Sequence, residues 1–160
     1  MKVIVTSDVH GKINTLSDIV KENQDAFMFI DCGDTELSPD RVVPFVSVEG
    51  NNDRYFEFPE TRVLQLGKIK ALVIHSHQIM MFKRDASLAK KARAVGAKVV
   101  FFGHYHVFYD KEVDGVRLIS PGSLFYNRDQ SQPSYATVDI EDKNIKVTRV
   151  NLQRQSLRGL

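Results

Sequence analysis

The sequence has one cysteine, no tryptophan and no long apolar run, and these absences exclude several classes of protein. Cys32 has no partner for an intramolecular disulfide, which excludes a disulfide-stapled scaffold and is typical of the reducing cytoplasm. No apolar stretch reaches the roughly 18 residues that a membrane span needs. The first residues, Met1 to Thr6, are too few and turn polar too soon for a signal peptide. We therefore expect a cytoplasmic protein with no membrane partner.

Excess charge is also lacking, because 22 Lys and Arg offset 20 Asp and Glu and leave a formal net charge of +2. This balance permits an anionic substrate without indicating a nucleic-acid partner. The 160 residues are 42% hydrophobic and 26% charged, as is ordinary for a globular domain. The length predicts a single domain over residues 1–160. Its polar, basic end, residues 151–160, is a candidate for a disordered tail.

Hydrophobic periodicity predicts alternating strands and helices in the first half and hairpins in the second. One helix is expected to be capped by Asn14, and a longer one to be capped by Asp85 and ended by Gly96. A short helix is expected to start at Ser38-Pro39. Strands are expected at residues 2–6, 26–30, 45–49, 62–66, 69–74, 99–102, 108–113, 116–120, 135–140 and 145–150. This order favours a mixed sheet, or a pair of sheets, covered by helices.

Five short polar segments each follow the end of a predicted apolar strand. They are Asp8-Val9-His10, Gly33-Asp34, Gly50-Asn51-Asn52-Asp53, His75-Ser76-His77 and Gly103-His104-Tyr105-His106. In open α/β sheets the ligand site lies at the carboxyl ends of the strands, so these loops are expected to converge. Carboxylate, imidazole and amide ligands suit Mn²⁺, Fe²⁺, Co²⁺, Ni²⁺ or Zn²⁺.

The spacing within two of these segments suits metal binding. Residues two apart on an extended chain point to the same side, so Asp8 and His10 are expected to aim at one point, as are His104 and His106. The latter pair would then be roughly 6–7 Å apart at the backbone. Such a pair suits two metals held about 3.5–4 Å apart, each of which takes one imidazole.

All five histidines of the chain fall in these segments. Each segment alone is weak evidence, because Asp-x-His, Gly-Asp and Gly-Asn sequences are common in turns and at surfaces. Histidines used for packing would be more scattered, so the joint pattern favours metal binding. The glycines at 33, 50 and 103 are expected to turn the backbone sharply out of its strand.

The segments D-x-H, GD, GN-x-D, H-x-H and G-H-x-H, in this order from Met1 to about Val150, resemble the calcineurin-like metallophosphoesterases. The short chain and the Ser120-Pro121-Gly122-Ser123 segment, an expected turn near the site, are similar to the compact YfcE-like phosphodiesterase branch. The resemblance implies a four-layer α/β/β/α sandwich of two mixed sheets flanked by helices. It also implies a dinuclear metal site at one edge.

Carried over residue by residue, the resemblance implies two groups of metal ligands and one bridging residue. One metal is expected on Asp8, His10 and His106, the other on Asn51, His75 and His104, with Asp34 and a water or hydroxide between them. The bridging hydroxide would attack the phosphorus atom of a small phosphodiester. Mn²⁺ is the first expectation for both metals, with Ni²⁺, Fe²⁺, Co²⁺ or Zn²⁺ as alternatives.

The sequence departs from the common family pattern at Asn52, where many members carry a histidine. An amide donates a hydrogen bond but delivers no proton near pH 7, which favours diester over monoester substrates. Asn52 and His77 are therefore catalytic candidates, although a structural role for His77 is equally open. Asp53 is expected to orient a ligand imidazole.

Two alternatives to a phosphodiesterase stay open. The retromer's phosphoesterase-like subunit has this fold and serves as a binding module, so a protein-binding scaffold is one, although the intact ligand set argues against it. A nuclease is the other, and it is favoured by a basic stretch around the longer helix but by no nucleic-acid motif. The stretch consists of Lys83, Arg84, Lys90, Lys91 and Arg93. Hairpin edges also leave a homo-oligomer open.

Overall fold

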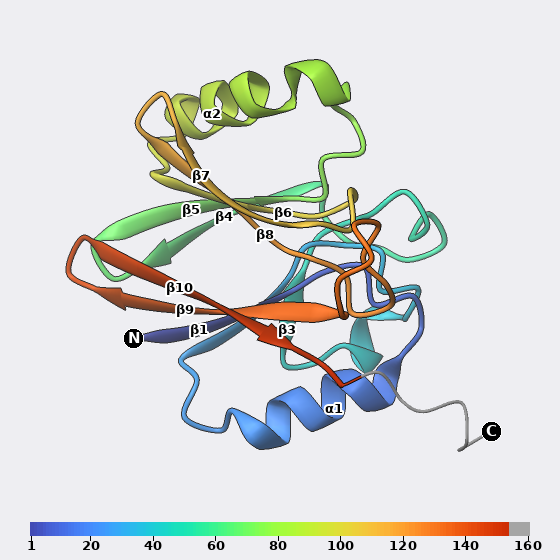
Figure 1. The fold of residues 1–160 in the computed structure, drawn as a ribbon. Coiled ribbons are helices and arrows are strands. Elements are labelled where there is room, and N and C mark those ends of the chain that lie inside the picture. The colour runs from blue at the N-terminus through green and yellow to red at the C-terminus, as the bar shows by residue number, and fades with distance from the viewer. Residues whose placement is uncertain (154–160) are drawn as a thin grey trace.

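The computed structural model describes residues 1–153, which form two five-stranded mixed sheets (Figure 1). The first sheet has the order β10-β9-β1-β2-β3. Its strands are β1 (Lys2–Thr6), β2 (Met28–Asp31), β3 (Phe45–Ser47), β9 (Ser134–Glu141) and β10 (Asn144–Asn151). β1, β2 and β3 are parallel, while β9 runs antiparallel to both β1 and β10.

The second sheet has the order β4-β5-β6-β8-β7. Its strands are β4 (Thr61–Leu66), β5 (Ile69–Ile74), β6 (Val99–Phe102), β7 (Phe108–Val113) and β8 (Val116–Pro121). β5, β6 and β8 are parallel, and antiparallel hairpin partners, β4 and β7, flank them on both edges. Each sheet thus contains three parallel strands whose carboxyl ends lie at one edge.

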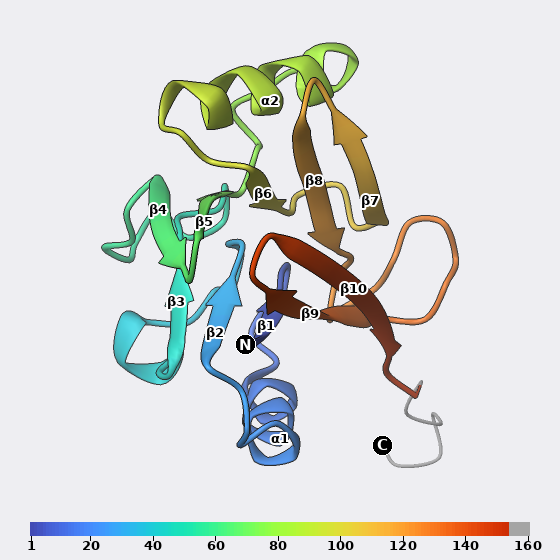
Figure 2. The same cartoon turned by 90° about the vertical axis from the view of Figure 1, so that its left-hand side faces the viewer.

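The two sheets are stacked between two helices, which gives the four layers that the sequence resemblance implied (Figures 1 and 2). α1 (Ile13–Glu22) covers the outer face of the first sheet, and α2 (Arg84–Ala94) covers the outer face of the second. Two 3₁₀ turns, η1 (Pro39–Arg41) and η2 (Met81–Lys83), lie in the connections. η1 is the short helix expected after Ser38.

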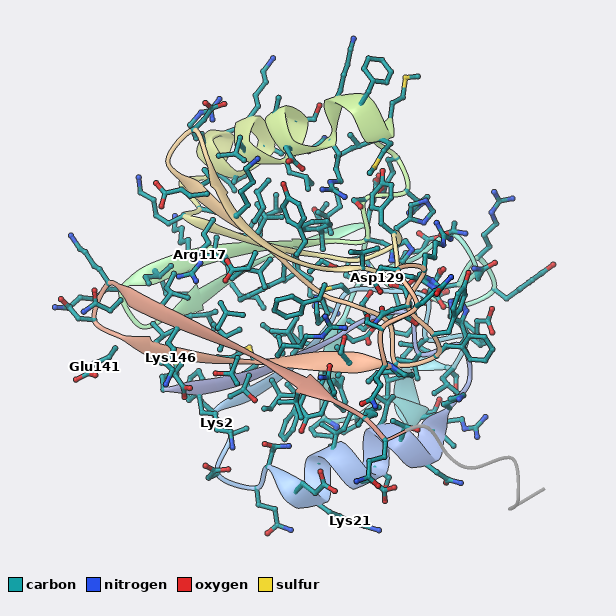
Figure 3. All side chains as sticks on the ribbon, in the orientation of Figure 1. Lys2, Lys21, Arg117, Asp129, Glu141 and Lys146 are labelled. Atoms are coloured by element: carbon teal, nitrogen blue, oxygen red, sulfur yellow. The ribbon has the colours of Figure 1, made fainter. Side chains whose placement is uncertain are left out.

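Three buried clusters fill the spaces between these layers. Alternation along β1 sends Val3 and Val5 into the cluster between the sheets, and Ile4 into the cluster under α1. Phe101 of β6 reaches the same central cluster from the second sheet, while Phe102 packs under α2. Figure 3 shows side chains filling the interior and the charged residues Lys21 and Glu141 at the periphery. The apolar runs of the sequence are thus strands covered on both faces.

Both predicted helix caps are wrong. Lys12 is the N-cap of α1, no side chain caps it, and Asn14 lies inside the first turn. α2 likewise starts one residue before Asp85. The carboxylate of Asp85 accepts hydrogen bonds from Arg84 Nε and the Tyr109 hydroxyl, so these partners occupy the oxygens that a cap would offer. Neither helix of the described chain is long and apolar enough to cross a membrane.

The predicted disordered tail is wrong where the structure describes it. Asn151 is the last residue of β10, paired with Ser134 of β9. The Leu152 amide donates to the Pro133 carbonyl at 2.7 Å, and its side chain packs on the cluster under α1. The remainder of this prediction, residues 154–160, lies outside the described residues.

Packing between the sheets is expected to dominate stability, and two phenylalanines test this. Phe101 is fully buried between the sheets, whereas Phe27 is 58% exposed. Phe101→Ala should lower the free energy of unfolding by about 3–5 kcal/mol, because it removes buried apolar surface and leaves a cavity. Phe27→Ala should change it by no more than about 0.5 kcal/mol. Urea denaturation measures both, and equal losses would contradict this placement of the core.

Candidate metal centre

The five polar segments meet at the edge where the parallel strands of both sheets end, as expected (Figure 1). Asp8 and His10 follow β1, Asp34 follows β2, and Asn51 follows β3. From the second sheet, His75 follows β5, and His104 and His106 both follow β6. Side chains from both sheets therefore face one another across the junction of the two sheets.

The backbone of these segments is not extended, so the expected geometry of alternating residues is wrong. Asp8, His10, His104 and His106 have positive φ angles of 53°, 48°, 77° and 56°. Residues other than glycine occupy this left-handed region at a cost of order 1 kcal/mol or more, and Asp and His are among those that tolerate it best. Strained backbone at the candidate ligands is a known feature of functional sites. This left-handed backbone turns Asp8 and His10, and likewise His104 and His106, toward the candidate metal centre.

The three glycines act in different ways. Gly33 has a φ of +100° and makes the sharp turn expected from the sequence. Gly50 and Gly103 lack positive φ angles and are required by close contacts instead. A Cβ at Gly50 would lie 2.1 Å from Asp34 Oδ1, and a Cβ at Gly103 would lie 1.9 Å from Ser7 Oγ. These two glycines let neighbouring loops approach the candidate ligands closely.

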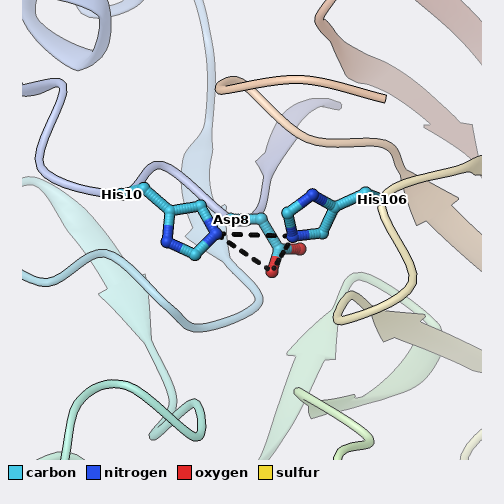
Figure 4. Close-up of side chains that lie close together, drawn as sticks. All are labelled: Asp8, His10 and His106. Atoms are coloured by element: carbon cyan, nitrogen blue, oxygen red, sulfur yellow. Dashed lines mark hydrogen bonds and ion pairs between the residues drawn. The ribbon is translucent and has the colours of Figure 1, made fainter. Parts of the chain in front are cut away.

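The first group of candidate ligands comprises Asp8, His10 and His106 (Figure 4). Asp8 Oδ1 lies 3.2 Å from His106 Nε2 and 4.0 Å from His10 Nε2, and the two Nε2 atoms are 3.4 Å apart. The outward Nδ1 atoms contact the Tyr126 carbonyl at 3.1 Å and Glu36 Oε1 at 3.4 Å. These contacts hold both rings with Nε2 toward the common centre, as in metal-binding histidines.

A second group surrounds Asn51. Its Oδ1 lies 3.0 Å from His75 Nε2 and 3.2 Å from His104 Nδ1, and Asp34 Oδ2 lies 3.4 Å from His75 Nε2. His75 Nδ1 contacts the Cys32 carbonyl at 2.7 Å, which orients the ring. Cys32 is fully buried. Two acid–imidazole groups, in which carboxylate and imidazole atoms lie within 4.8 Å of one another, overlap at this centre. The first is Asp8, His10 and His106, the second is Asp8, Asp34 and His75, and Asp8 is therefore a member of both.

Asp8 has the most unusual environment in the centre. Its side chain is 1% exposed, and Oδ1 has no hydrogen-bond partner among residues 1–153. The nearest nitrogens are His106 Nε2 at 3.2 Å and His75 Nε2 at 3.8 Å, which form ion pairs with Asp8 when those imidazoles are protonated. A buried carboxylate oxygen is normally satisfied by donors or by a cation. The surrounding groups therefore fit a bound metal ion.

The buried charges shift one another's pKa values. Burial favours neutral His75, but the carboxylates of Asp34 and Asp8 outweigh it and raise the His75 pKa to about 9. Burial raises the pKa of Asp34, but His75 and the hydrogen bonds from Asn52 together lower it further, so it ends below its ordinary value. Burial, and then the charge on His75, lower the pKa of His104 to about 4. A proton on His75 thus supplies positive charge between the carboxylates, and a metal ion would displace it.

Asn52 and Asp53 both act on the Asp34 loop. The Asn52 backbone amide and Nδ2 donate to the two carboxylate oxygens of Asp34, each at 2.8 Å. Asp53 is fully buried and accepts from the amides of Asp34 at 2.7 Å, Glu36 at 2.9 Å and Gly50 at 2.8 Å. The expectation that Asp53 orients an imidazole is wrong, because backbone amides take its oxygens.

His77 lies beside the second group. Its ring centroid is 5.4 Å from that of His75 and 6.2 Å from that of His104. Burial and the charge of His75 lower its pKa. Nδ1 is buried and has no hydrogen-bond partner among residues 1–153. His77 thus stands next to the candidate ligands but outside the two acid–imidazole groups.

The segment after β8 contributes a serine that sequence reasoning undervalued. Ser123 Oγ donates to the Asp8 carbonyl at 2.9 Å, and it accepts from the amides of Phe125 and Tyr126 at 2.9 and 3.2 Å. Ser7 Oγ donates to Asp8 Oδ2 at 2.6 Å. The sequence feature that could have identified Ser123 is its place just after the end of β8, a third parallel strand of the second sheet. This place brings Ser123 to the same edge as the histidines.

The basic stretch around α2 is less basic at the surface than its sequence suggested. Arg84 is 7% exposed. Its guanidinium stacks over the rings of Phe102, Tyr105 and Tyr109 at 5.0, 4.8 and 4.6 Å. This arginine packs α2 against the sheet and offers no charge to a nucleic acid.

A model of the calcineurin-like phosphoesterase superfamily domain matches residues 1–143. The chain belongs to this family, which confirms the resemblance read from the sequence. It is 32% identical over 145 residues to Probable metallophosphoesterase YsnB of Bacillus subtilis, covering 89% of this chain and 86% of that protein. It is 33% identical over 144 residues to Probable metallophosphoesterase MG207 of Mycoplasma genitalium, covering 86% of each.

Solved structures share the same fold. A Streptococcus pneumoniae protein described as a predicted phosphoesterase superposes with a TM-score of 0.87 at 28% identity, covering 94% of this chain and 88% of that one. Two more distant structures each have a TM-score of 0.71 and cover 94% of this chain. They are Entamoeba histolytica Vps29 complexed with Zn²⁺, 22% identical and 99% covered, and an archaeal phosphodiesterase, 20% identical and 100% covered. At these identities the last two show the fold alone.

Asp31, buried below the centre, gives a pH-dependent test of its electrostatics. Its carboxylate accepts from Thr6 Oγ1 at 2.7 Å, Gly33 N at 2.8 Å and Ser47 Oγ at 3.1 Å, yet burial raises its pKa from 3.8 to about 7. Between these values the folded chain holds a proton that the unfolded chain has lost, so wild-type stability falls as pH rises.

Asp31→Asn removes this titration. In metal-free protein, the free energy of unfolding of the variant relative to wild type should rise by up to about 4 kcal/mol between about pH 4 and pH 7. Urea denaturation at several pH values measures the difference. A difference independent of pH would contradict a raised pKa for Asp31.

Proposed function

We propose that this chain is a metal-dependent phosphodiesterase with a two-metal centre. The observation that carries the proposal is the pair of carboxylate–imidazole clusters, Asp8 with His10 and His106 and Asp8 with Asp34 and His75. They share Asp8, whose buried Oδ1 has no hydrogen-bond partner in the described chain. Two adjacent groups of carboxylate, imidazole and amide donors suit a pair of divalent ions. Membership of the phosphoesterase family supports phosphate ester hydrolysis as the reaction.

The proposed ligands follow the two groups. Asp8, His10 and His106 would hold one ion, and Asn51, His75 and His104 the other, with Asp34 between the two ions. Contacts of 3.0 to 3.4 Å among these ligand atoms support the grouping. Mn²⁺ is the proposed ion, and Ni²⁺, Fe²⁺, Co²⁺ or Zn²⁺ would suit the same nitrogen and oxygen donors.

Divalent ions bound there would supply a hydroxide nucleophile near neutral pH and neutralise charge on the phosphoryl oxygens. Two such ions, two ligand carboxylates and one hydroxide leave a net charge of roughly +1, which matches the single charge of a phosphodiester. Hydrogen bonds from neighbouring residues hold the two carboxylates in position. Asn52 holds both oxygens of Asp34, and Ser7 holds Oδ2 of Asp8.

The preference for diesters rests on Asn52. Its Nδ2 donates to Asp34 Oδ2, and an amide has no proton to give to a leaving alkoxide near pH 7. Monoester hydrolysis benefits most from such a proton, so its loss weighs more on monoesters. His77 is the proposed neighbour for a substrate contact, because its ring stands beside that of His75 in the second group.

The hydrolase is favoured over both alternatives. Every position of the proposed ligand set carries a metal-binding side chain, which a protein-binding scaffold does not need. The burial of Arg84 removes part of the basic surface that favoured a nuclease. A cytoplasmic location, a single domain and a homo-oligomer paired through hairpin edges stay predictions from the sequence.

Parallel assays of two synthetic substrates test the function. Protein stripped of metal and reloaded with Mn²⁺ should hydrolyse bis-p-nitrophenyl phosphate with a higher kcat/KM than p-nitrophenyl phosphate, because the single charge of the diester matches the net charge of the centre. Chelator should remove the activity. A higher kcat/KM for the monoester would contradict the proposed preference for diesters.

The variant Asp34→Asn tests the bridging role of Asp34, because it keeps the shape of the side chain and removes its charge. It should reduce hydrolysis of both substrates to background while the circular dichroism spectrum stays native. Near-normal rates would contradict the place of Asp34 between the ions. A folded wild type that takes up no metal and turns over neither substrate would favour the scaffold.

A further inference from the structure

A pocket of about 410 Å³ opens beside the first ligand group. Its wall consists of His10, Glu36 and His106 on the metal-centre side, and Phe125 and Tyr126 on the other. The two aromatic side chains are 46% and 49% exposed. Large rings left half-exposed beside a candidate active site, rather than packed in the core, are typical of a ligand-binding wall.

The two rings project from a rigid segment. The amides of Phe125 and Tyr126 both donate to Ser123 Oγ, and the Asn127 side chain accepts from Ser123 N at 2.8 Å. The Tyr126 carbonyl contacts His106 Nδ1 at 3.1 Å. The backbone that carries the rings is therefore anchored to a candidate metal ligand, and little conformational entropy would be lost when a ligand binds.

Both rings contact the imidazoles of the first group. Phe125 meets His10 edge-on with ring centroids 5.6 Å apart, and Tyr126 meets His106 in the same way at 5.5 Å. Lys12 Nζ lies over the Phe125 ring, 5.0 Å from its centroid. A phosphoryl group at the metal centre would thus lie next to two aromatic rings.

We propose that Phe125 and Tyr126 form a subsite for a planar aromatic group of the substrate. The inference rests on the proposed function and narrows its substrate class to aryl or nucleoside phosphodiesters. Flat π systems pack on aromatic side chains through stacked or edge contacts, and nucleobases and phenyl rings share this chemistry. An alkyl group in the same place would gain less from the two rings.

Calorimetric titration of Mn²⁺-loaded protein with two phosphonates isolates the aromatic contribution. Phenylphosphonate and methylphosphonate present the same phosphorus group to the metal centre, and neither can be hydrolysed as an ester. Phenylphosphonate should bind about tenfold more tightly, in keeping with ring stacking in other proteins. Adenosine 5′-monophosphate against ribose 5-phosphate forms the nucleotide arm. Preference in that arm indicates a nucleoside ester, and preference in the phenyl pair alone indicates a simple aryl ester.

The double variant Phe125→Leu/Tyr126→Leu removes both rings and keeps apolar side chains. It should abolish the preference for phenylphosphonate over methylphosphonate. Phe82→Leu is the matched control, because Phe82 is also exposed, at 73%, but does not line the pocket. It should retain the preference. Thermal unfolding of each variant checks that the fold is intact.

The outcomes separate this inference from the proposed function. Methylphosphonate binding with no aromatic preference in either arm would overturn the subsite and leave the metal centre standing. A preference that survives in the double variant would also overturn it. If neither phosphonate binds to the metal-loaded wild type, the phosphoryl site itself fails, and the subsite fails with it.

Discussion

A buried carboxylate with one unsatisfied oxygen is the constraint on which the rest of the site depends. Asp8 Oδ2 accepts from Ser7 Oγ at 2.6 Å and from the His104 amide at 3.1 Å, whereas Oδ1 has no donor in the described chain. Such a charge is costly to bury unless an opposite charge lies beside it. Without metal, protonation of His75 supplies that charge, and a divalent ion would supply it better.

The fold meets this constraint by joining two sheets at one edge. Three parallel strands of each sheet end there, so candidate ligands arrive from both sides of the junction. Asp8, Asp34 and Asn51 come from the first sheet, and His75 and His106 from the second. Packing of the sheets through the central cluster therefore sets the distances between ligands. The same edge receives the segment after β8, which adds the aromatic wall beside the first ligand group.

Much of this centre could be predicted because its residues have local signatures. Histidines placed after apolar strands, and glycines before Asp34, Asn51 and His104, located the loops, and the family pattern gave the four layers. Features that depend on tertiary contacts could not be predicted. The positive φ of His10, the acceptance of three amides by Asp53 and the role of Ser123 all depend on loops distant in sequence. The N-caps failed for the same reason, since Asp85 bonds to Tyr109 of a later strand.

Titration of metal-free protein with Mn²⁺, followed by calorimetry, tests the two-metal centre most directly. Two ions per chain are expected for the wild type, with release of protons as His75 is deprotonated. Asp8→Asn should weaken the binding of the first ion, because Asp8 supplies the carboxylate of the first ligand group. Asp18→Asn, at an exposed position of α1, should leave both unchanged. Fewer than two ions in the wild type, or normal binding of both by Asp8→Asn, would contradict the proposal.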